Sequence, residues 1–219
     1  MWDSAMTTLI IQGTFETLYM TITSTLIAYI IGLPMGVLLV TSDSEGIVPM
    51  NLVNKILNIV VNITRSIPFL ILLIAVIPFT RLITGTSIGS TATIVPLVIA
   101  AAPFIARLVE SSIKEVDKGI IEASLSMGAS PLQVVTKVMI PEAKPSLIIG
   151  AAIATTTILG YSAMAGIVGG GGLGDIAIRF GYYRYETGVM VVTVVLLVLV
   201  VQIFQEAGMK IAQKQDRRK

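Results

Sequence analysis

Carboxylates are the candidate acid–base groups and metal ligands of this chain. The sequence has 13 Asp and Glu residues but no histidine and no cysteine, which excludes serine–histidine pairs, thiolate nucleophiles and most zinc sites. Acid–base work by carboxylates needs two of them close enough to share a proton. Asp175 follows an apolar stretch, whereas Asp3, Asp43, Asp117 and Asp216 fall in expected tails or loops. The sequence therefore predicts no catalytic residue and no metal site.

The glycine-rich stretch before Asp175 carries two misleading patterns. Gly169, Gly171 and Gly174 match G-x-G-x-x-G, but a dinucleotide site needs a preceding strand, a following helix and an acidic residue about 20 positions later. These glycines join two apolar segments, so we expect a flexible connection and no cofactor in this chain. Gly172-Leu173-Gly174-Asp175 also resembles the G-x-G-D signature of intramembrane aspartyl proteases, a distant alternative that the lack of a second intramembrane aspartate disfavours.

The elements around these residues are apolar enough to lie in a membrane. Of 219 residues, 54% are hydrophobic and 13% are charged, which is about half the charged share of a soluble domain, and the mean hydropathy is +0.89. Long charge-free runs predict an all-α integral membrane protein with five transmembrane helices, since a span needs roughly 20 apolar residues. This excludes a soluble enzyme, a DNA-binding protein and a disordered tail. The expected helices cover residues 17–41, 55–80, 88–111, 145–168 and 188–209.

Positive charge divides the connecting segments into two groups. The N-terminal tail, the 81–87 turn and the 169–187 loop contain Arg81, Arg179 and Arg184, whereas the other twelve of the 15 Lys and Arg residues lie in the opposite group. Loops that face the cytoplasm collect Lys and Arg. We therefore expect the N-terminus outside, on the periplasmic side, and the C-terminus in the cytoplasm.

The longest stretch outside the expected spans, residues 112–144, contains the signals of a short helix. Ser130 can cap a helix, and Pro131 suits its first position. Because Pro141 has no backbone N–H to donate, the helix should stop near the preceding residue. The expected helix covers about residues 131–140.

This short helix is amphipathic, because Leu132, Val135 and Met139 are spaced to share one face. Composition alone leaves two interpretations open. The helix could rest on lipid headgroups, or it could dock onto a cytoplasmic partner.

A spaced motif decides between these interpretations. Glu122-Ala123-Ser124, Gly128 and Val138-Met139-Ile140-Pro141 resemble the EAA loop of permease subunits in ATP-binding-cassette (ABC) importers, where Glu-Ala-Ala, Gly and Ile-x-Leu-Pro occur at this spacing. Three positions differ mildly, with Ser for Ala, Val for Ile and Ile for Leu. The resemblance favours the docking element.

Four further segments are similar to the D/L-methionine importer permeases within that class. They are residues 62–69 (NITRSIPF), 85–89 (GTSIG), 101–107 (AAPFIAR) and 160–164 (GYSAM). The five-span plan with an outside N-terminus also matches this subfamily. Another small amino acid as substrate remains an alternative, and so does a passive channel, although a channel would have no use for a docking loop.

The resemblance implies a type I ABC importer permease fold. Its transmembrane domain is expected over residues 13–205, with the cytoplasmic coupling helix between spans 3 and 4 and a basic cytoplasmic tail over 210–219. Such proteins form homodimers in the inner membrane, bind two ATPase subunits, receive methionine from a periplasmic or lipoprotein binding protein, and work by alternating access. The chain has no Gly-Lys dipeptide and hence no P-loop, so it is not expected to be an enzyme; ATP would be bound by the partner ATPase.

The resemblance assigns the ATPase contact to residues of the EAA loop: Glu122, Ala123, Ser124, Gly128, Ala129, Pro131, Leu132, Ile140 and Pro141. We expect Glu122 to position the loop through hydrogen bonds or ion pairs. Gly128 is expected to allow a tight turn before the coupling helix.

Polar or soft residues within the spans are candidates for the translocation path or its gate: Arg65, Thr156, Tyr161, Ser162 and Met164. Arg65 shares a helix face with Asn58 and Asn62, which could form a cytoplasmic mouth. However, snorkelling of Arg65 and Arg107 to lipid headgroups is the favoured explanation for both arginines. The thioether of Met164 would suit an adaptable gate, whereas the threonines can also hydrogen-bond within their own helix.

Overall fold

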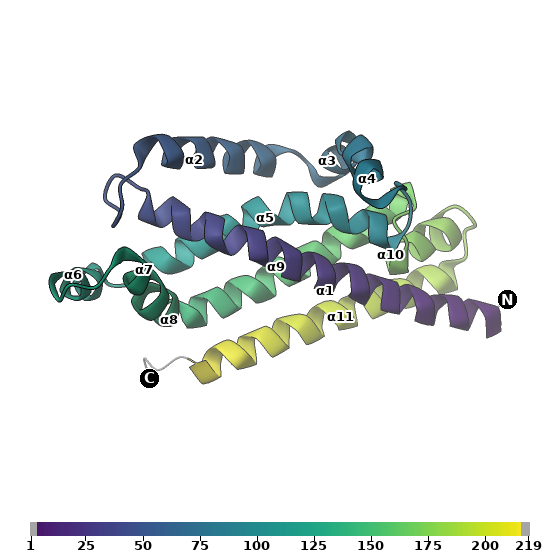
Figure 1. Ribbon diagram of the computed structural model, residues 1–219. Coiled ribbons are helices and arrows are strands. Elements are labelled where there is room, and N and C mark those ends of the chain that lie inside the picture. The colour runs from purple at the N-terminus through teal and green to yellow at the C-terminus, as the bar shows by residue number, and fades with distance from the viewer. Residues whose placement is uncertain (1–3, 216–219) are drawn as a thin grey trace. The chain divides into compact units, whose positions relative to one another are not determined.

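The chain is helical along nearly its whole length. The computed structural model describes residues 4–215, which contain no strand, and the last part of the expected basic tail lies outside them. The long helices are α1 (Ser4–Thr41), α5 (Ser90–Lys114), α9 (Lys144–Ala165) and α11 (Thr187–Gln215) (Figure 1). The shorter α-helices are α2 (Asn51–Ser66), α3 (Phe69–Ala75), α4 (Ile77–Thr84), α6 (Lys118–Ser126), α7 (Pro131–Val134), α8 (Ile140–Glu142) and α10 (Gly172–Ile176). Two π-helical segments, η1 (Val135–Met139) and η3 (Ala177–Tyr182), and a 3₁₀ turn, η2 (Gly166–Val168), complete the described part.

Four helical segments within residues 4–215 are long and apolar enough to cross a bilayer alone: Ser4–Thr41, Ser90–Lys114, Lys144–Val168 and Thr187–Gln215. A fifth crossing would need α2 and α3 together, and this pair bends by 104° at its junction. The single helix expected over residues 55–80 therefore does not form. Pro68 disfavours a helical conformation at the residue before it, and Pro78 lies in the first turn of α4, so the segment breaks into three helices.

The described residues form two compact units. The first unit comprises residues up to 27, 67–101 and 155–205, and the second comprises residues 28–66, 102–154 and from 206 onward. Helices α1, α5, α9 and α11 contribute to both. Each unit has its own apolar cluster, with Ile10, Leu173, Ile176 and Val189 in the first and Leu39, Val61 and Ala106 in the second.

Polar contacts within each unit bring particular connecting segments together. In the first unit, the backbone N–H of Gly172 donates to Glu16, which joins the glycine-rich loop to the N-terminal half of α1. In the second unit, Lys118 pairs with Glu45, which joins the start of α6 to the turn after α1. These pairings agree with the grouping that the positive charges predict. Which group faces the cytoplasm stays a prediction.

Two glycines bring α1 close to α5 within the second unit. An added β-carbon at Gly32 or Gly36 would lie 2.7 or 2.6 Å from the carbonyl oxygens of Ala102 and Ala106. Only hydrogen atoms fit between the two backbones there. This close contact fixes the end of α1, and the turn that follows it, beside the end of α5.

The glycine-rich loop is packed, contrary to the flexible connection expected from the sequence. The side chains of Glu16 and Thr17 accept hydrogen bonds from the N–H groups of Gly172 and Leu173, at 2.8 and 2.9 Å. Gly171 and Gly172 have φ values of 82° and 76°, and added β-carbons would meet Glu16 and Thr17 at 2.9 and 2.6 Å. The glycines serve a close approach of α10 to α1.

Candidate functional site

Helix α6 carries the first part of the EAA motif. Ser124 is buried, and its hydroxyl donates to the carbonyl of Ile120 at 2.8 Å, whereas Glu122 and Ala123 are exposed. Among residues 4–215, the Glu122 side chain makes no hydrogen bond or ion pair, although its charge acts on Lys118, one helical turn earlier. Its carboxylate does not hold the loop through a contact within the chain, so it is available to a partner.

A left-handed residue, Gly128, joins α6 to α7. Its φ is 87°, and the N–H groups of Gly128 and Ala129 donate to the carbonyls of Leu125 and Ser124 at 2.9 and 3.1 Å. This bond pair is the Schellman arrangement that ends helices. An added β-carbon would meet no atom within 4 Å. Glycine is therefore required by the backbone conformation and not by crowding.

The next helix begins at Pro131, as its sequence predicts. The Ser130 hydroxyl accepts from the N–H of Gln133 at 3.4 Å, and the Gln133 side chain accepts from the N–H of Ser130 at 2.9 Å. This reciprocal pair is a capping box. It satisfies N–H groups that the start of a helix leaves free.

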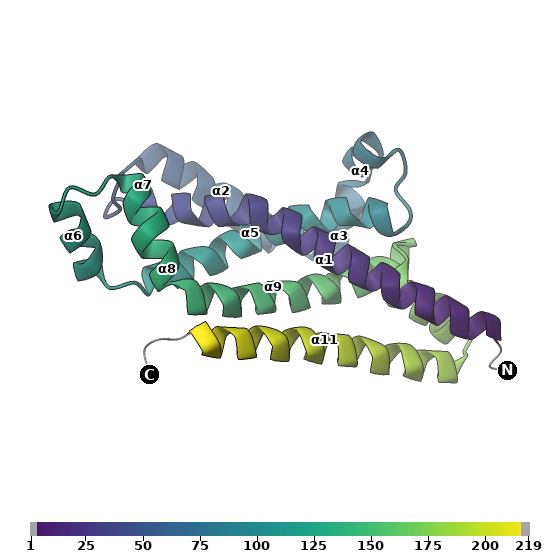
Figure 2. The same cartoon turned by 60° about the horizontal axis from the view of Figure 1, so that its bottom comes forward.

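The expected stop before Pro141 is wrong, because the helical path continues through α8 to Glu142. In η1 the backbone hydrogen bonds span five residues and not four, and the N–H of Ile140 donates to the carbonyl of Val135. A proline ring clashes with the carbonyl four residues back in an α-helix, and a π-turn relieves that clash. The N–H of Ala143 then donates to Met139 at 3.0 Å, so the path leads almost directly into α9 (Figure 2).

The π-turn also changes which side chains share a face. Val134 and Met139, five residues apart, are buried, whereas Leu132 is 72% exposed. The expected face of Leu132, Val135 and Met139 is therefore not buried as one surface. Met127, at the end of α6, is 81% exposed. Exposed large apolar side chains of this kind indicate a surface that contacts a partner or a membrane.

Ion pairs tie this region to the turn after α1. Lys118 lies 2.8 Å from Glu45, and Lys114 lies 2.8 Å from Glu110 and 3.7 Å from Asp43. The hydrogen bond and positive charge of Lys118 lower the pKa of Glu45, and the same contact raises the pKa of Lys118. Because both of these side chains are exposed, their pair orients α6 more than it stabilises the fold.

A polar cluster joins α2 to α5. The guanidinium of Arg107 donates to the side-chain oxygens of Asn58 and Asn62, both at 2.7 Å, and pairs with Glu110 at 2.5 Å. Arg107 is thus held inside the second unit and does not extend to headgroups as the snorkelling interpretation expected. Asn58 and Asn62 share a face with Arg65 in the sequence, but their partner in the structure is Arg107.

Arg65 itself is exposed on α2. Its guanidinium lies 5.9 Å from the centre of the Phe104 ring, a cation–π contact within the second unit. This contact is compatible both with a role of Arg65 in the translocation path and with snorkelling to headgroups.

The other path candidates lie on α9, and three of them have distinct surroundings in the first unit. Tyr161 stacks on Phe69, with ring centres 4.5 Å apart and planes 4° apart. Ser162 is buried and donates to the carbonyl of Leu159 in its own helix, whereas Met164 is 46% exposed. The side chains of Tyr161 and Met164 are therefore more accessible than that of Ser162. Thr156 also lies on α9 in the first unit.

Two carboxylates of the first unit line a small hollow of about 70 Å³. Asp175 pairs with Arg179, and Glu16 accepts from Gly172 and from Gln12. Each carboxylate is occupied by a donor, which does not suit proton transfer. The aspartyl protease interpretation finds no support in this geometry.

Sequence reasoning missed three structural contributors. Glu16 and Thr17 cap α10, and the one available signal was a single acidic residue beside apolar segments. Phe69 belongs to a quoted motif, but nothing in its spacing pointed to Tyr161. The turn with Asp43 and Glu45 had no signal beyond its charge.

Comparisons with known proteins agree on one family. Residues 28–208 match the family described as the binding-protein-dependent transport system inner membrane component. The chain is 48% identical over 217 residues to the probable D-methionine transport system permease protein MetI of Vibrio cholerae, covering 99% of this chain and 96% of the relative. It is 51% identical over 158 residues to the D-methionine transport system permease protein MetI of Escherichia coli K12, covering 72% and 73%.

Solved structures show the same likeness. A chain of the MetNI methionine ABC transporter in an inward-facing conformation matches with a TM-score of 0.97 at 48% identity, covering 99% of this chain and 100% of that one. A chain of an amino acid ABC transporter with histidines matches with a TM-score of 0.78 at 21% identity, covering 95% and 94%. The second match concerns the fold alone.

Proposed function

Because the chain belongs to the family of binding-protein-dependent transport system inner membrane components, we propose that it is the permease of an ATP-driven methionine importer. Its relatives are named D-methionine transport permeases, and its fold matches a chain of the MetNI methionine ABC transporter at a TM-score of 0.97. The observation in this chain that carries the proposal is the EAA segment. In that segment, Gly128 in the left-handed conformation joins α6 to α7. Helix α7 begins with a capping box, and its Leu132 is exposed.

We propose that this segment receives mechanical work from an ATPase subunit. The chain has no Gly-Lys dipeptide and hence no P-loop, so nucleotide energy has to arrive through a protein contact. The path from α7 through η1 and α8 reaches α9 with only Ala143 outside a helix, and Leu147 donates to Ala143 at 2.9 Å. Displacement of the docking segment would therefore pass into α9 and bias a two-state permease.

The proposed assembly contains two copies of this chain, two ATPase subunits and an external methionine-binding protein. The charge split supports an orientation with the N-terminus outside and the EAA segment in the cytoplasm. The same orientation gives five crossings if α2 and α3 form one bent span.

Uptake in cells tests the proposed substrate. In a host without high-affinity methionine uptake, expression of this chain with its ATPase and binding protein should restore accumulation of labelled methionine. Accumulation of another small amino acid, with none of methionine, would contradict the substrate and leave the importer class standing. If no amino acid accumulates although all subunits reach the membrane, the importer proposal is wrong.

A further inference from the structure

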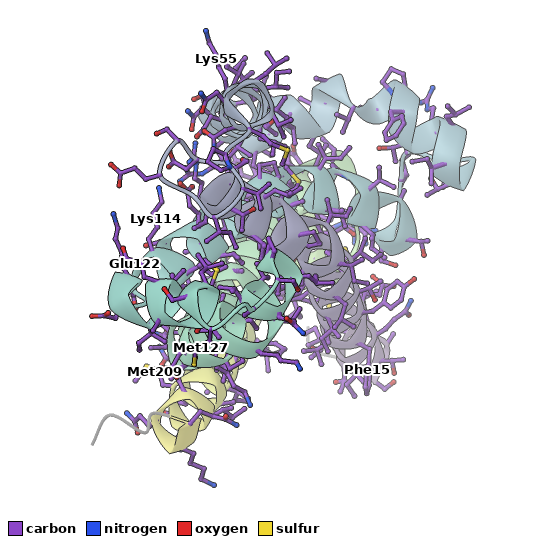
Figure 3. All side chains as sticks on the ribbon, turned by 60° about the vertical axis from the view of Figure 1, so that its left-hand side comes forward. Phe15, Lys55, Lys114, Glu122, Met127 and Met209 are labelled. Carbon is purple, nitrogen blue, oxygen red and sulfur yellow. The ribbon has the colours of Figure 1, made fainter. Side chains whose placement is uncertain are left out.

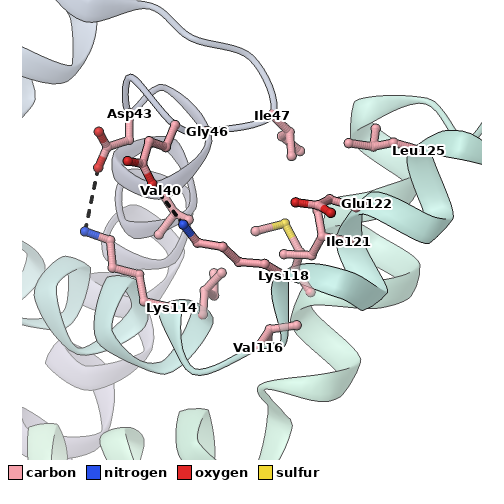
Figure 4. Close-up of a pocket in the computed structure, with 13 residues that line it drawn as sticks. Val40, Asp43, Gly46, Ile47, Lys114, Val116, Lys118, Ile121, Glu122 and Leu125 are labelled. Atoms are coloured by element: carbon pink, nitrogen blue, oxygen red, sulfur yellow. Dashed lines mark hydrogen bonds and ion pairs between the residues drawn. The ribbon is translucent and has the colours of Figure 1, made fainter.

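A pocket of about 450 Å³ separates α6 from the turn after α1 (Figure 4). Ile47 on the turn and Leu125 on α6 lie on opposite sides of it, and Met139 lines it from η1. The lining is therefore largely apolar and includes residues of the EAA motif. A volume of this size accommodates several side chains of a partner segment.

The charged groups around the pocket do not balance. Asp43, Glu45 and Glu122 contribute three negative charges, and Lys114 and Lys118 contribute two positive ones. Both ammonium groups are already bound to carboxylates, by the contacts given above. Lys114 and Glu122 project from the same side of the second unit (Figure 3). Among the described residues, Glu122 forms no close ion pair, and the cation that its charge acts on, Lys118, is bound to Glu45.

The wall formed by the turn is held in place before any partner binds. An added β-carbon at Gly46 would lie 2.4 Å from the carbonyl oxygen of Thr41, so the turn folds tightly onto the end of α1. The N–H of Val48 donates to Thr41 at 3.0 Å, and the Asn54 amide donates to Leu39 at 2.8 Å. A preformed wall lowers the ordering cost of binding.

We propose that the turn formed by residues 42–47 is a second docking wall for the ATPase subunit, opposite α6. The segment that enters the pocket carries an apolar side chain next to a basic one. This inference rests on the proposed function, because the ATPase is the partner. It extends the docking surface from the EAA loop to the connection between α1 and α2.

Charge and exposure select this occupant. The pocket lining carries one net negative charge, which favours a basic protein segment over an anionic lipid headgroup as its occupant. Leu125 lines the pocket and is 37% exposed, so a partner that fills the pocket also covers this apolar side chain. A protein segment with mixed apolar and basic character satisfies both features.

A matched pair of substitutions tests the second wall. Ile47→Lys removes an apolar contact and adds positive charge in the pocket, whereas Asn51→Lys adds the same charge at an exposed position that does not line it. We expect Ile47→Lys to reduce co-purification of the ATPase about tenfold, as loss of one interface anchor does, and Asn51→Lys to leave it unchanged. Equal retention of the ATPase by both variants would overturn the proposal.

Crosslinking gives a readout that does not depend on how well a substitution is tolerated. The chain has no cysteine, so Ile47→Cys can carry a single photoreactive maleimide in the assembled complex. The label should crosslink to the ATPase, and the same label at Arg81→Cys, on the expected outer side, should not. Crosslinks from position 47 to lipid alone would overturn the proposal.

Variants of the EAA loop separate this inference from the proposed function. If a Gly128 substitution releases the ATPase while Ile47→Lys retains it and position 47 gives no crosslink, only the second wall is wrong. If the unsubstituted chain binds no ATPase, the proposed function itself fails.

Discussion

At the scale of the residue, Gly128 is required by its backbone and not by its neighbours. Its φ of 87° is a conformation that residues with side chains rarely adopt, yet an added β-carbon would meet no atom within 4 Å. We expect Gly128→Val to break the turn, because a β-branched residue there is strained by about 1–2 kcal/mol. Gly128→Asn should be tolerated, since asparagine visits the left-handed region more readily. Co-purification of the ATPase with equally expressed variants measures the difference.

The contradicting outcome is equal behaviour of the two substitutions. If valine and asparagine at position 128 both retain the ATPase, the left-handed turn does not position the docking segment. If both release it, added volume and not φ is the cause, against the open space around the glycine.

Residue-scale prediction from the sequence succeeded where local chemistry decides. Ser130 and Pro131 start a helix through contacts with near neighbours, so their role is readable from the chain. The partner of Arg107 is not readable, because Asn58 and Asn62 lie 49 and 45 residues away and meet it only through helix packing. Long-range polar pairs of this kind leave no periodic signal.

At the scale of the element, the ion pair between Glu45 and Lys118 links the turn after α1 to α6. We expect Glu45→Lys to loosen the start of α6 and the exchanged pair Glu45→Lys with Lys118→Glu to restore it, because the exchange returns opposite charges to contact. Hydrogen exchange of α6 amides measures this. Restoration should fade at high salt, where exposed pairs are screened. Equal exchange in the single and double variants would contradict the link.

The same pair sets a pH window. The pKa of Glu45 is lowered. The stabilisation that this carboxylate gives the ion pair is therefore present at neutral pH and is lost as pH falls below the ordinary glutamate range, about pH 4. The pKa of Lys118 is raised, so its contribution is lost only as pH rises beyond the ordinary lysine value, about pH 10. The difference in exchange between the intact chain and Glu45→Gln should therefore stay constant between roughly pH 6 and 9.

The cap on α10 is the corresponding contact in the first unit. Glu16→Ala leaves the buried N–H of Gly172 without its acceptor, which costs about 1–3 kcal/mol, whereas Glu16→Gln keeps an acceptor oxygen. We expect a lower thermal midpoint for the alanine variant in detergent, by about 2–4 °C for each kcal/mol lost, and a smaller change for glutamine. An alanine variant as stable as the intact chain would show that the cap contributes nothing.

The elements were harder to predict than the residues, because a glycine run and a proline are each compatible with more than one structure. The glycine run indicated flexibility, but its glycines permit the approach of α10 to Glu16 and Thr17. Pro141 indicated a helix end, but a π-turn absorbs it. In both cases the outcome depends on packing that a linear pattern does not contain.

At the scale of the whole molecule, the absence of cysteine makes the orientation directly measurable. We expect Ser126→Cys on α6 to be protected from an impermeant thiol reagent in intact cells and Tyr183→Cys, on the predicted outer side, to react. Both side chains are exposed, so reactivity reports the side of the membrane. Reaction at position 126 together with protection at 183 would reverse the topology.

The general class of the molecule was readable from its sequence because membrane solubility imposes long apolar runs. The all-helical fold was predicted correctly from the apolar runs and the family from the EAA spacing, whereas the broken helix in place of residues 55–80 was not. The difference is physical: hydropathy reports solvent preference, but it does not report the backbone restriction that Pro68 places on the residue before it.

Reconstituted transport tests the central claim most directly. Vesicles that contain this chain and its ATPase, supplied with the binding protein and ATP, should accumulate labelled methionine against a gradient. The same vesicles with Gly128→Val should not, and those with Gly128→Asn should. Methionine accumulation that needs no ATP, or that Gly128→Val leaves at the level of the intact chain, would contradict an importer driven through the EAA loop.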